Sequence, residues 1–259
     1  MNPNLCRVVL RPRGPLEVFD LGMRFAHANR SVLLRLTALV VGVPWLLLVP
    51  ICWWFEGAWW VALLPLPLFP FVQAPFTLMG GRLLFRDDAT VGQTLQELLR
   101  ATGRVSGIVL TGFVSTLLSL ATCGYGYLPL LAAVLYVPET ALLERVGLDR
   151  GLRRSLRLAG GHLGVALVGA TARVFLTLWA AAVAEGFGQA VFDTTFQLGQ
   201  PFGAAANGEV TPFLLFGMLL AQPIHAIYRL LLYVDVRTRV EGWDLQVGLR
   251  AAGLARTKA

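Results

Sequence analysis

The sequence predicts an all-α integral membrane protein with six transmembrane helices, and three observations lead to this fold class. First, 56% of the 259 residues are hydrophobic and only 14% are charged, whereas soluble domains carry about 25% charged residues. Second, the apolar residues lie in runs long enough to cross a bilayer, which takes about 20 residues. Third, the basic residues flank these runs and rarely interrupt them.

Five apolar runs give the six predicted spans. Four runs are single spans, at residues 36–55, 57–81, 163–184 and 210–228, and among them only the third contains a charged residue, Arg173. The fifth run, residues 105–138, would make a helix of about 51 Å, which is too long for one crossing. The Gly- and Tyr-containing turn at its centre divides it into predicted spans at 105–122 and 126–144.

The placement of arginine orients these spans. All 22 basic residues except Arg173 and Arg229 lie on the side that holds the N-terminus, residues 80–104, residues 145–161 and the C-terminal tail. The opposite side has no Lys or Arg. Because positive residues near span ends stay in the cytoplasm during insertion, we expect a multi-pass bacterial inner-membrane protein with both termini inside. A five-span arrangement would place the arginines of 145–157 outside.

The first apolar run begins about 35 residues into the chain and is too long for the core of a signal peptide, so we expect an uncleaved first span. The three cysteines, Cys6, Cys52 and Cys123, have no metal-binding spacing. Cys52 and Cys123 both fall near predicted outer helix ends, where a disulfide is conceivable. The alternative is that both are small apolar side chains within helices.

Each pair of spans follows a cationic segment with helical periodicity. In the third segment, for example, Leu148, Leu152 and Leu156 alternate with arginines, a pattern typical of a helix lying in the headgroup plane. We therefore predict one membrane domain over residues 1–259, built from three repeats of an interfacial amphipathic helix followed by a transmembrane hairpin. The repeats cover about 15–81, 90–144 and 147–236, and a cytoplasmic tail covers 237–259.

Ionisable or strongly polar side chains at membrane depth are costly, so they mark candidate sites. The sequence nominates an intramembrane polar cluster of Arg173, Glu139, Arg229, His225 and Gln222. One interpretation is structural pairing within the bundle, with Glu139 bound to Arg173 or Arg229, and our working hypothesis pairs it with Arg173. The other is a polar cavity, open to the cytoplasm, that receives an anionic headgroup or solute.

Two further segments leave alternatives open. The second span contains Pro65, Pro67, Pro70 and Pro75, which remove backbone donors, so it is either a broken helix lining a path or one kinked helix. Residues 185–211 contain several phenylalanines and no basic residue. We predict an external interfacial or re-entrant helix there, with contact to a partner as a further possibility.

The last predicted span ends in a ladder of alternating charges: Asp235, Arg237, Arg239, Glu241 and Asp244. It can pair with itself or with the arginines of 150–157, and we expect it to close the cytoplasmic face and fix helix register. The stretch Leu231 to Leu245, with its Tyr-x-Asp-x-Arg-x-Arg-x-Glu-Gly-x-Asp-Leu pattern, resembles the end of the last span in the bacterial family named for the membrane domain of glycerophosphoryl diester phosphodiesterase. Residues 152–161 and 15–34 resemble other helices of that family.

The resemblance implies a stand-alone membrane domain without the soluble catalytic barrel of such phosphodiesterases. The chain has no nucleophile elbow, zinc-protease motif or phosphate-binding glycine loop, so we predict no catalytic, cofactor or metal site and no enzymatic activity. No basic stripe is interleaved with aromatic residues, so we expect no nucleic-acid partner. Expected partners are anionic lipid headgroups and a protein partner or second copy in the membrane.

These observations favour a membrane scaffold or assembly partner in a cell-envelope complex. The alternative is a transporter or lipid-handling protein that uses the intramembrane polar residues. A weaker third option is an enzyme that forms a site only in complex.

Overall fold

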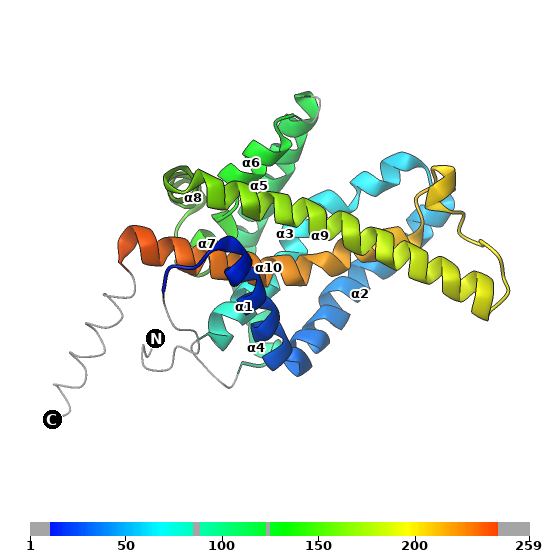
Figure 1. The fold of residues 1–259 in the computed structure, drawn as a ribbon, viewed down its shortest axis with the longest axis horizontal. Helices are drawn as coiled ribbons and strands as arrows, with labels where there is room; N and C mark the ends of the chain where they lie inside the picture. Colours follow the sequence, from blue (N-terminus) through cyan, green and yellow to red (C-terminus); the bar gives the residue numbers. More distant parts are fainter. Residues whose placement is uncertain (1–10, 85–88, 123–124, 243–259) are drawn as a thin grey trace.

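The computed structural model describes residues 11–84, 89–122 and 125–242, and every regular element in these ranges is helical (Figure 1). The longer helices, in chain order, are α1 (Pro15–Ala28), α2 (Arg30–Trp54), α3 (Pro65–Leu83), α4 (Val91–Arg100), α5 (Thr102–Ala121), α8 (Leu148–Gly161), α9 (Leu163–Ala190) and α10 (Pro212–Glu241). The shorter elements are η2 (Trp59–Leu63), α6 (Tyr127–Ala133), α7 (Val137–Leu142), η3 (Val191–Thr195) and η4 (Ala205–Asn207).

Helix α10 is the centre of the fold. The side chain of Thr211 caps the start of α10 by accepting a hydrogen bond from the backbone N–H of Leu214. Gly242, in the left-handed conformation, follows its last residue. Such a start and stop are favoured by threonine, proline and glycine at these positions. Helix α10 packs against α1, α2, α3 and α9, and 78% of its most apolar stretch is buried, against 28% in α2 and in α9. The outer helices α2 and α9 therefore leave most of their apolar surface uncovered.

Helices α9 and α10 run along the long axis of the molecule, side by side (Figure 1). Their close contact depends on Gly217 of α10, where a Cβ atom would lie 2.3 Å from the carbonyl oxygen of Ala180 and 2.6 Å from the Cα of Ala181. Only glycine permits the two backbones to come so near.

Four helical stretches of the described chain are long and apolar enough to cross a membrane: residues 30–54, 59–83, 163–195 and 212–240. They correspond to the first, second, fifth and sixth predicted spans. Helices α4 and α5 together would make a fifth, but they are bent by 79° where they meet. The bend agrees with the prediction of an amphipathic helix followed by a separate span near 105–122. Six spans and a threefold repeat remain predictions.

The predicted fourth span, residues 126–144, departs from a single crossing helix. It consists of α6 and α7, with turns between them, and its apolar length ends at Leu142. Pro138 is the physical reason: it has no N–H to donate to the carbonyl of Val134, and that carbonyl instead accepts from the N–H of Val137 at 3.1 Å. The α5–α6 hairpin projects to one side of the long axis of α9 and α10 (Figure 1).

Two open questions from the sequence are answered by these helices. The proline-rich second span is not broken at its prolines, because α3 is one helix from Pro65 to Leu83 with Pro70 and Pro75 inside it. The separate external helix predicted within 185–211 is wrong. Helix α9 instead continues to Ala190 and passes directly into the π-helical turn η3, so that one helical stretch runs over residues 163–195. The remainder of the segment contains only the short 3-10 turn η4.

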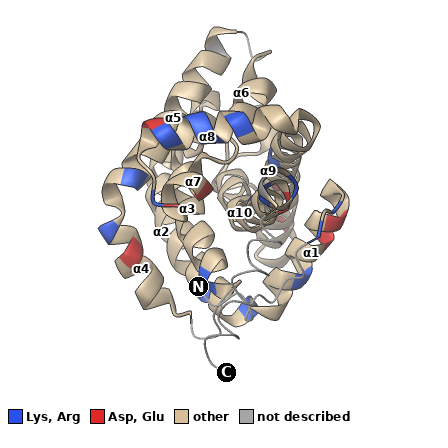
Figure 2. Cartoon of the chain, turned by 90° about the vertical axis from the view of Figure 1, so that its left-hand side faces the viewer, with Lys and Arg blue, Asp and Glu red and all other residues tan. Residues whose placement is uncertain are grey.

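All three predicted amphipathic segments are helices, namely α1, α4 and α8. Figure 2 looks onto the end of the molecule where α10 terminates and shows arginines of these helices there (Figure 2). Helix α4 starts at Thr90, whose side chain accepts a hydrogen bond from the backbone of Gln93, as a helix N-cap should.

Candidate functional site

A buried ion pair joins α7 to α10 in the interior of the bundle. The Nε of Arg229 lies 2.8 Å from Oε1 of Glu139, and both side chains are almost fully buried. The two terminal nitrogens of Arg229 donate to Oε1 of Gln73 and, at 3.2 Å, to the hydroxyl of Thr77. Arg229 thus holds α3 and α7 against α10 through three side-chain hydrogen bonds, as a rigid guanidinium fork allows.

The network extends from Gln73 along α10 to α9. Nε2 of Gln73 donates to Oε1 of Gln222 at 2.6 Å and lies 3.4 Å from Nδ1 of His225. Gln222 in turn donates to the hydroxyl of Thr177 at 3.3 Å and to the carbonyl of Met218 at 2.7 Å. Four of the five residues nominated from sequence therefore meet in one network, namely Glu139, Gln222, His225 and Arg229. This network links helices α3, α7, α9 and α10.

Arg173, the fifth nominated residue, is placed differently from our working hypothesis. The partner of Glu139 is Arg229 and not Arg173, because Glu139 faces α10 across the bundle while Arg173 lies on α9. The guanidinium of Arg173 instead lies over the ring of Phe69, 5.7 Å from its centroid, within the range of a cation–π contact. Its Nε has no hydrogen-bond partner among the described residues.

The space beside this cluster is small. A cavity of about 30 Å³ is lined by Gln73, Arg173 and Arg229 together with apolar side chains of α3, α5, α6 and α7. It has room for a few water molecules, each of which needs about 10–15 Å³ by this kind of measure. Arg173, which lines the cavity, has an Nε atom without a hydrogen-bond partner among the described residues. The polar side chains of the cluster therefore bind chiefly one another, and Arg173, Arg229 and Glu139 together carry one excess formal positive charge.

Gln73, Thr77 and Thr177 are the members of this network that the sequence prediction missed. Gln73 was visible as a polar residue inside the proline-rich run, at a depth where an uncharged amide needs a partner. Thr77 gave no such signal, because a threonine can satisfy itself by bonding the carbonyl four residues earlier, as Thr77 also does with Gln73.

The charge ladder forms contacts within itself, with the segment that precedes α1, and with Glu144. Asp235 pairs with Arg239 at 2.8 Å, and its other oxygen accepts from the backbone N–H of Arg13 at 2.7 Å. Arg237 lies 3.6 Å from Glu144, which also pairs with Arg154 of α8 at 2.5 Å. The side chain of Glu241 and the whole of Asp244 lie outside the described residues.

Cys52 is a free thiol in the structure, and its S–H donates to the carbonyl of Val210 at 2.8 Å. Cys123 lies outside the described residues. Within the described ranges, no group of three or more His, Cys, Asp or Glu side chains is arranged to hold a metal ion.

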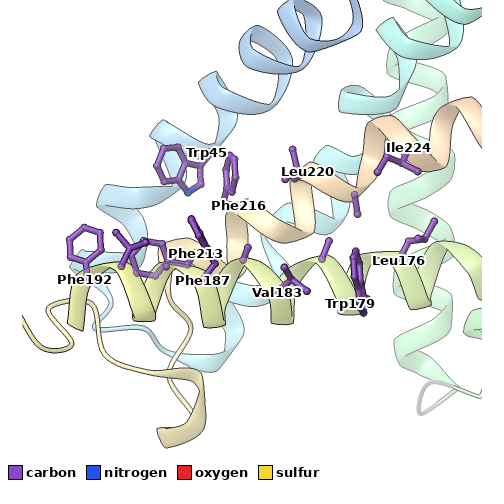
Figure 3. Close-up of a pocket in the computed structure, with 15 residues that line it drawn as sticks. Trp45, Leu176, Trp179, Val183, Phe187, Phe192, Phe213, Phe216, Leu220 and Ile224 are labelled. Atoms are coloured by element: carbon purple, nitrogen blue, oxygen red, sulfur yellow. The ribbon is translucent and has the colours of Figure 1, made fainter. Parts of the chain in front are cut away.

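A second candidate site is an apolar groove of about 490 Å³ between α2, α9 and α10. Figure 3 shows Trp45 of α2, Trp179, Val183 and Phe187 of α9, and Phe213, Phe216 and Leu220 of α10 directed at this space (Figure 3). None of its lining side chains is charged. We call this feature the α2–α9–α10 groove.

Comparisons with models of protein families, with curated proteins and with solved structures gave no match for this chain. The family resemblance of the C-terminal ladder therefore remains an expectation from sequence.

Proposed function

We propose that this protein is a non-enzymatic, multi-pass membrane protein that acts as a scaffold or assembly partner, and that the α2–α9–α10 groove receives a transmembrane helix of its partner. The single observation that carries the proposal is the groove itself: a large, wholly apolar hollow on helices that already form a packed bundle. The proposed location is a bacterial inner membrane, with both termini in the cytoplasm.

The groove has the composition of an interface. Tryptophan and phenylalanine dominate its walls, and aromatic residues are enriched at the centres of protein interfaces. Several of them are uncovered: Trp179 is 58% exposed and Phe187 is 71% exposed. A partner whose side chains fill the hollow would gain close dispersion contacts, and such contacts are a principal force between helices in lipid.

The small residues of α9 are already used within the chain, which defines how a partner would bind. A Cβ atom at Gly188 would lie 2.3 Å from the ring of Phe213, and Ala180 lies against Gly217. The partner helix would therefore not make a close backbone crossing on this face. It would insert large apolar side chains between the aromatic walls.

The small size of the cavity at the polar cluster favours this function over the transport alternative. A path for a solute needs a continuous polar cavity, whereas the space next to Arg173 and Arg229 measures about 30 Å³. The polar groups there bind one another and span four helices, which is what a register-fixing clasp requires.

The test is affinity purification of the full chain from its native membrane in mild detergent, with mass spectrometry of retained proteins and lipids. We expect one protein at near-stoichiometric yield with the wild type. We expect at least a tenfold lower yield with Ala184→Trp, because Ala184 lines the groove and a tryptophan there would fill it.

Ala182→Trp is the matched control. Ala182 is exposed on the same helix two residues away and does not line the groove, so this variant should retain the partner at the wild-type level. Equal retention by both variants would contradict the groove as the docking site. A specific retained lipid without a stoichiometric protein would favour the lipid-handling alternative.

A further inference from the structure

A polar pocket of about 500 Å³ lies at the basic end of the molecule, where α3 ends, α4 bends into α5 and α7 ends. Four arginines line it, Arg82, Arg100, Arg104 and Arg145, together with a single acidic residue, Glu97. The formal excess is therefore three positive charges. Its volume falls within the range of about 300–1,000 Å³ typical of small-molecule sites.

Glu97 organises one half of the pocket. Its two carboxylate oxygens lie 3.0 Å from Nε of Arg82 and 3.1 Å from Nη2 of Arg145. Arg145 has a φ of 57°, in the left-handed region that a non-glycine residue adopts only at a cost. Strained residues of this kind cluster at binding sites, where surrounding contacts hold them in place.

The other half of the pocket carries uncompensated charge. Arg100 and Arg104 form no ion pair with any residue of the described chain. The two arginines are four residues apart in the sequence, on either side of the bend between α4 and α5. Both line the same pocket. Guanidinium groups gathered in a pocket match the geometry of phosphate oxygens, which accept two parallel N–H bonds from each fork.

We propose that this pocket binds the phosphate of an anionic phospholipid headgroup. The proposal rests on the chain being in a membrane and does not depend on the α2–α9–α10 groove. Apolar residues favour a lipid over a free phosphate. Leu78 and Leu142 line the pocket, Leu99 beside Arg100 is 74% exposed, and Leu110 and Phe113 further along α5 are also exposed. Basic pockets between transmembrane helices on the cytoplasmic side are known recognition sites for such headgroups.

The experiment uses the full chain purified in dodecyl maltoside, with unfolding temperature measured against added dioleoylphosphatidylglycerol. A ligand that binds the folded state raises this temperature with concentration, which yields an apparent Kd. We expect a saturable rise with phosphatidylglycerol, and none with dioleoylphosphatidylcholine or inorganic phosphate. In Arg100→Gln/Arg104→Gln, the apparent Kd should rise about twenty-fivefold, because each arginine near a lipid surface contributes about a fivefold gain in affinity.

The matched control is Arg150→Gln/Arg157→Gln, which removes two exposed arginines of α8 outside the pocket and should keep the wild-type Kd. Since Arg100 and Arg104 pair with no carboxylate of the described residues, the lipid-free unfolding temperature should not change. If the double variant does not fold, each single variant should weaken binding about fivefold. Wild-type affinity in the pocket variants, an equal loss in the control, or an equal temperature rise with phosphatidylcholine or inorganic phosphate would each overturn the proposal.

Discussion

Replacing Glu139 with leucine should lower the unfolding temperature of the detergent-purified protein by about 10 °C, and Arg229→Met should do the same. Each change leaves the partner as a buried, uncompensated charge, which costs about 3–5 kcal/mol. For a chain of this length, each kcal/mol corresponds to about 2–4 °C. The double variant Glu139→Leu/Arg229→Met removes both charges and should recover most of the loss, since apolar replacement of a buried pair is often neutral.

Arg173→Met supplies the control for this cycle. Arg173 lies over Phe69 and forms no ion pair among the described residues, so its loss orphans no carboxylate. We expect a smaller change for this variant, and additivity within about 0.5 kcal/mol when it is combined with Glu139→Leu. Strong coupling of Glu139 with Arg173, together with additivity between Glu139 and Arg229, would show that the pairing described here is wrong.

Gly217→Ala should be the most damaging single-methyl substitution in the interface of α9 and α10. The added Cβ would meet the Ala180 carbonyl oxygen at 2.3 Å and the Cα of Ala181 at 2.6 Å, and backbone atoms cannot move aside without separating the helices. Overpacking of this kind costs about 1–3 kcal/mol or more, which outweighs the gain of about 1 kcal/mol that alanine brings to a helix interior. Thermal unfolding in detergent should therefore fall by several degrees.

The corresponding control is Gly186→Ala in α9, where a Cβ atom would meet nothing within 4 Å. Helix propensity then acts alone, and this variant should be as stable as the wild type or slightly more so. A Gly217→Ala protein as stable as Gly186→Ala would mean that the two helices do not approach each other as described.

The length of the apolar runs predicted four membrane-length helical stretches well. Run length reflects the thickness of the hydrocarbon core, and the lack of charge reflects its apolar character. The fourth span shows what run length misses. Residues 126–144 are apolar enough, yet Pro138 interrupts the hydrogen bonding between α6 and α7. The extent of α9 was underestimated because Glu185 suggested the end of a span. Its carboxylate is instead satisfied within the fold by Thr211 and Gln189.

Burial cost singled out Arg173, Glu139, Gln222, His225 and Arg229 in the sequence, because each must find a partner away from water. The structure joins the last four in one hydrogen-bond network and gives Glu139 a different partner from the one hypothesised. The choice between Arg173 and Arg229 as the partner of Glu139 depends on which helices are neighbours and which way each side chain points. The periodicity of residues within one span determines neither the neighbouring helices nor these directions. The basic pocket was invisible for the same reason, since its arginines come from separate segments.

A partner helix in the α2–α9–α10 groove should be captured by photo-crosslinking in intact cells. A benzophenone amino acid would replace Val183, which lines the groove and is 50% exposed, or Leu178, which is 64% exposed on α9 but does not line it. The account predicts one discrete protein adduct from position 183 and at least fivefold less of it from position 178. Equal adduct from both positions, or lipid adducts alone from position 183, would contradict it.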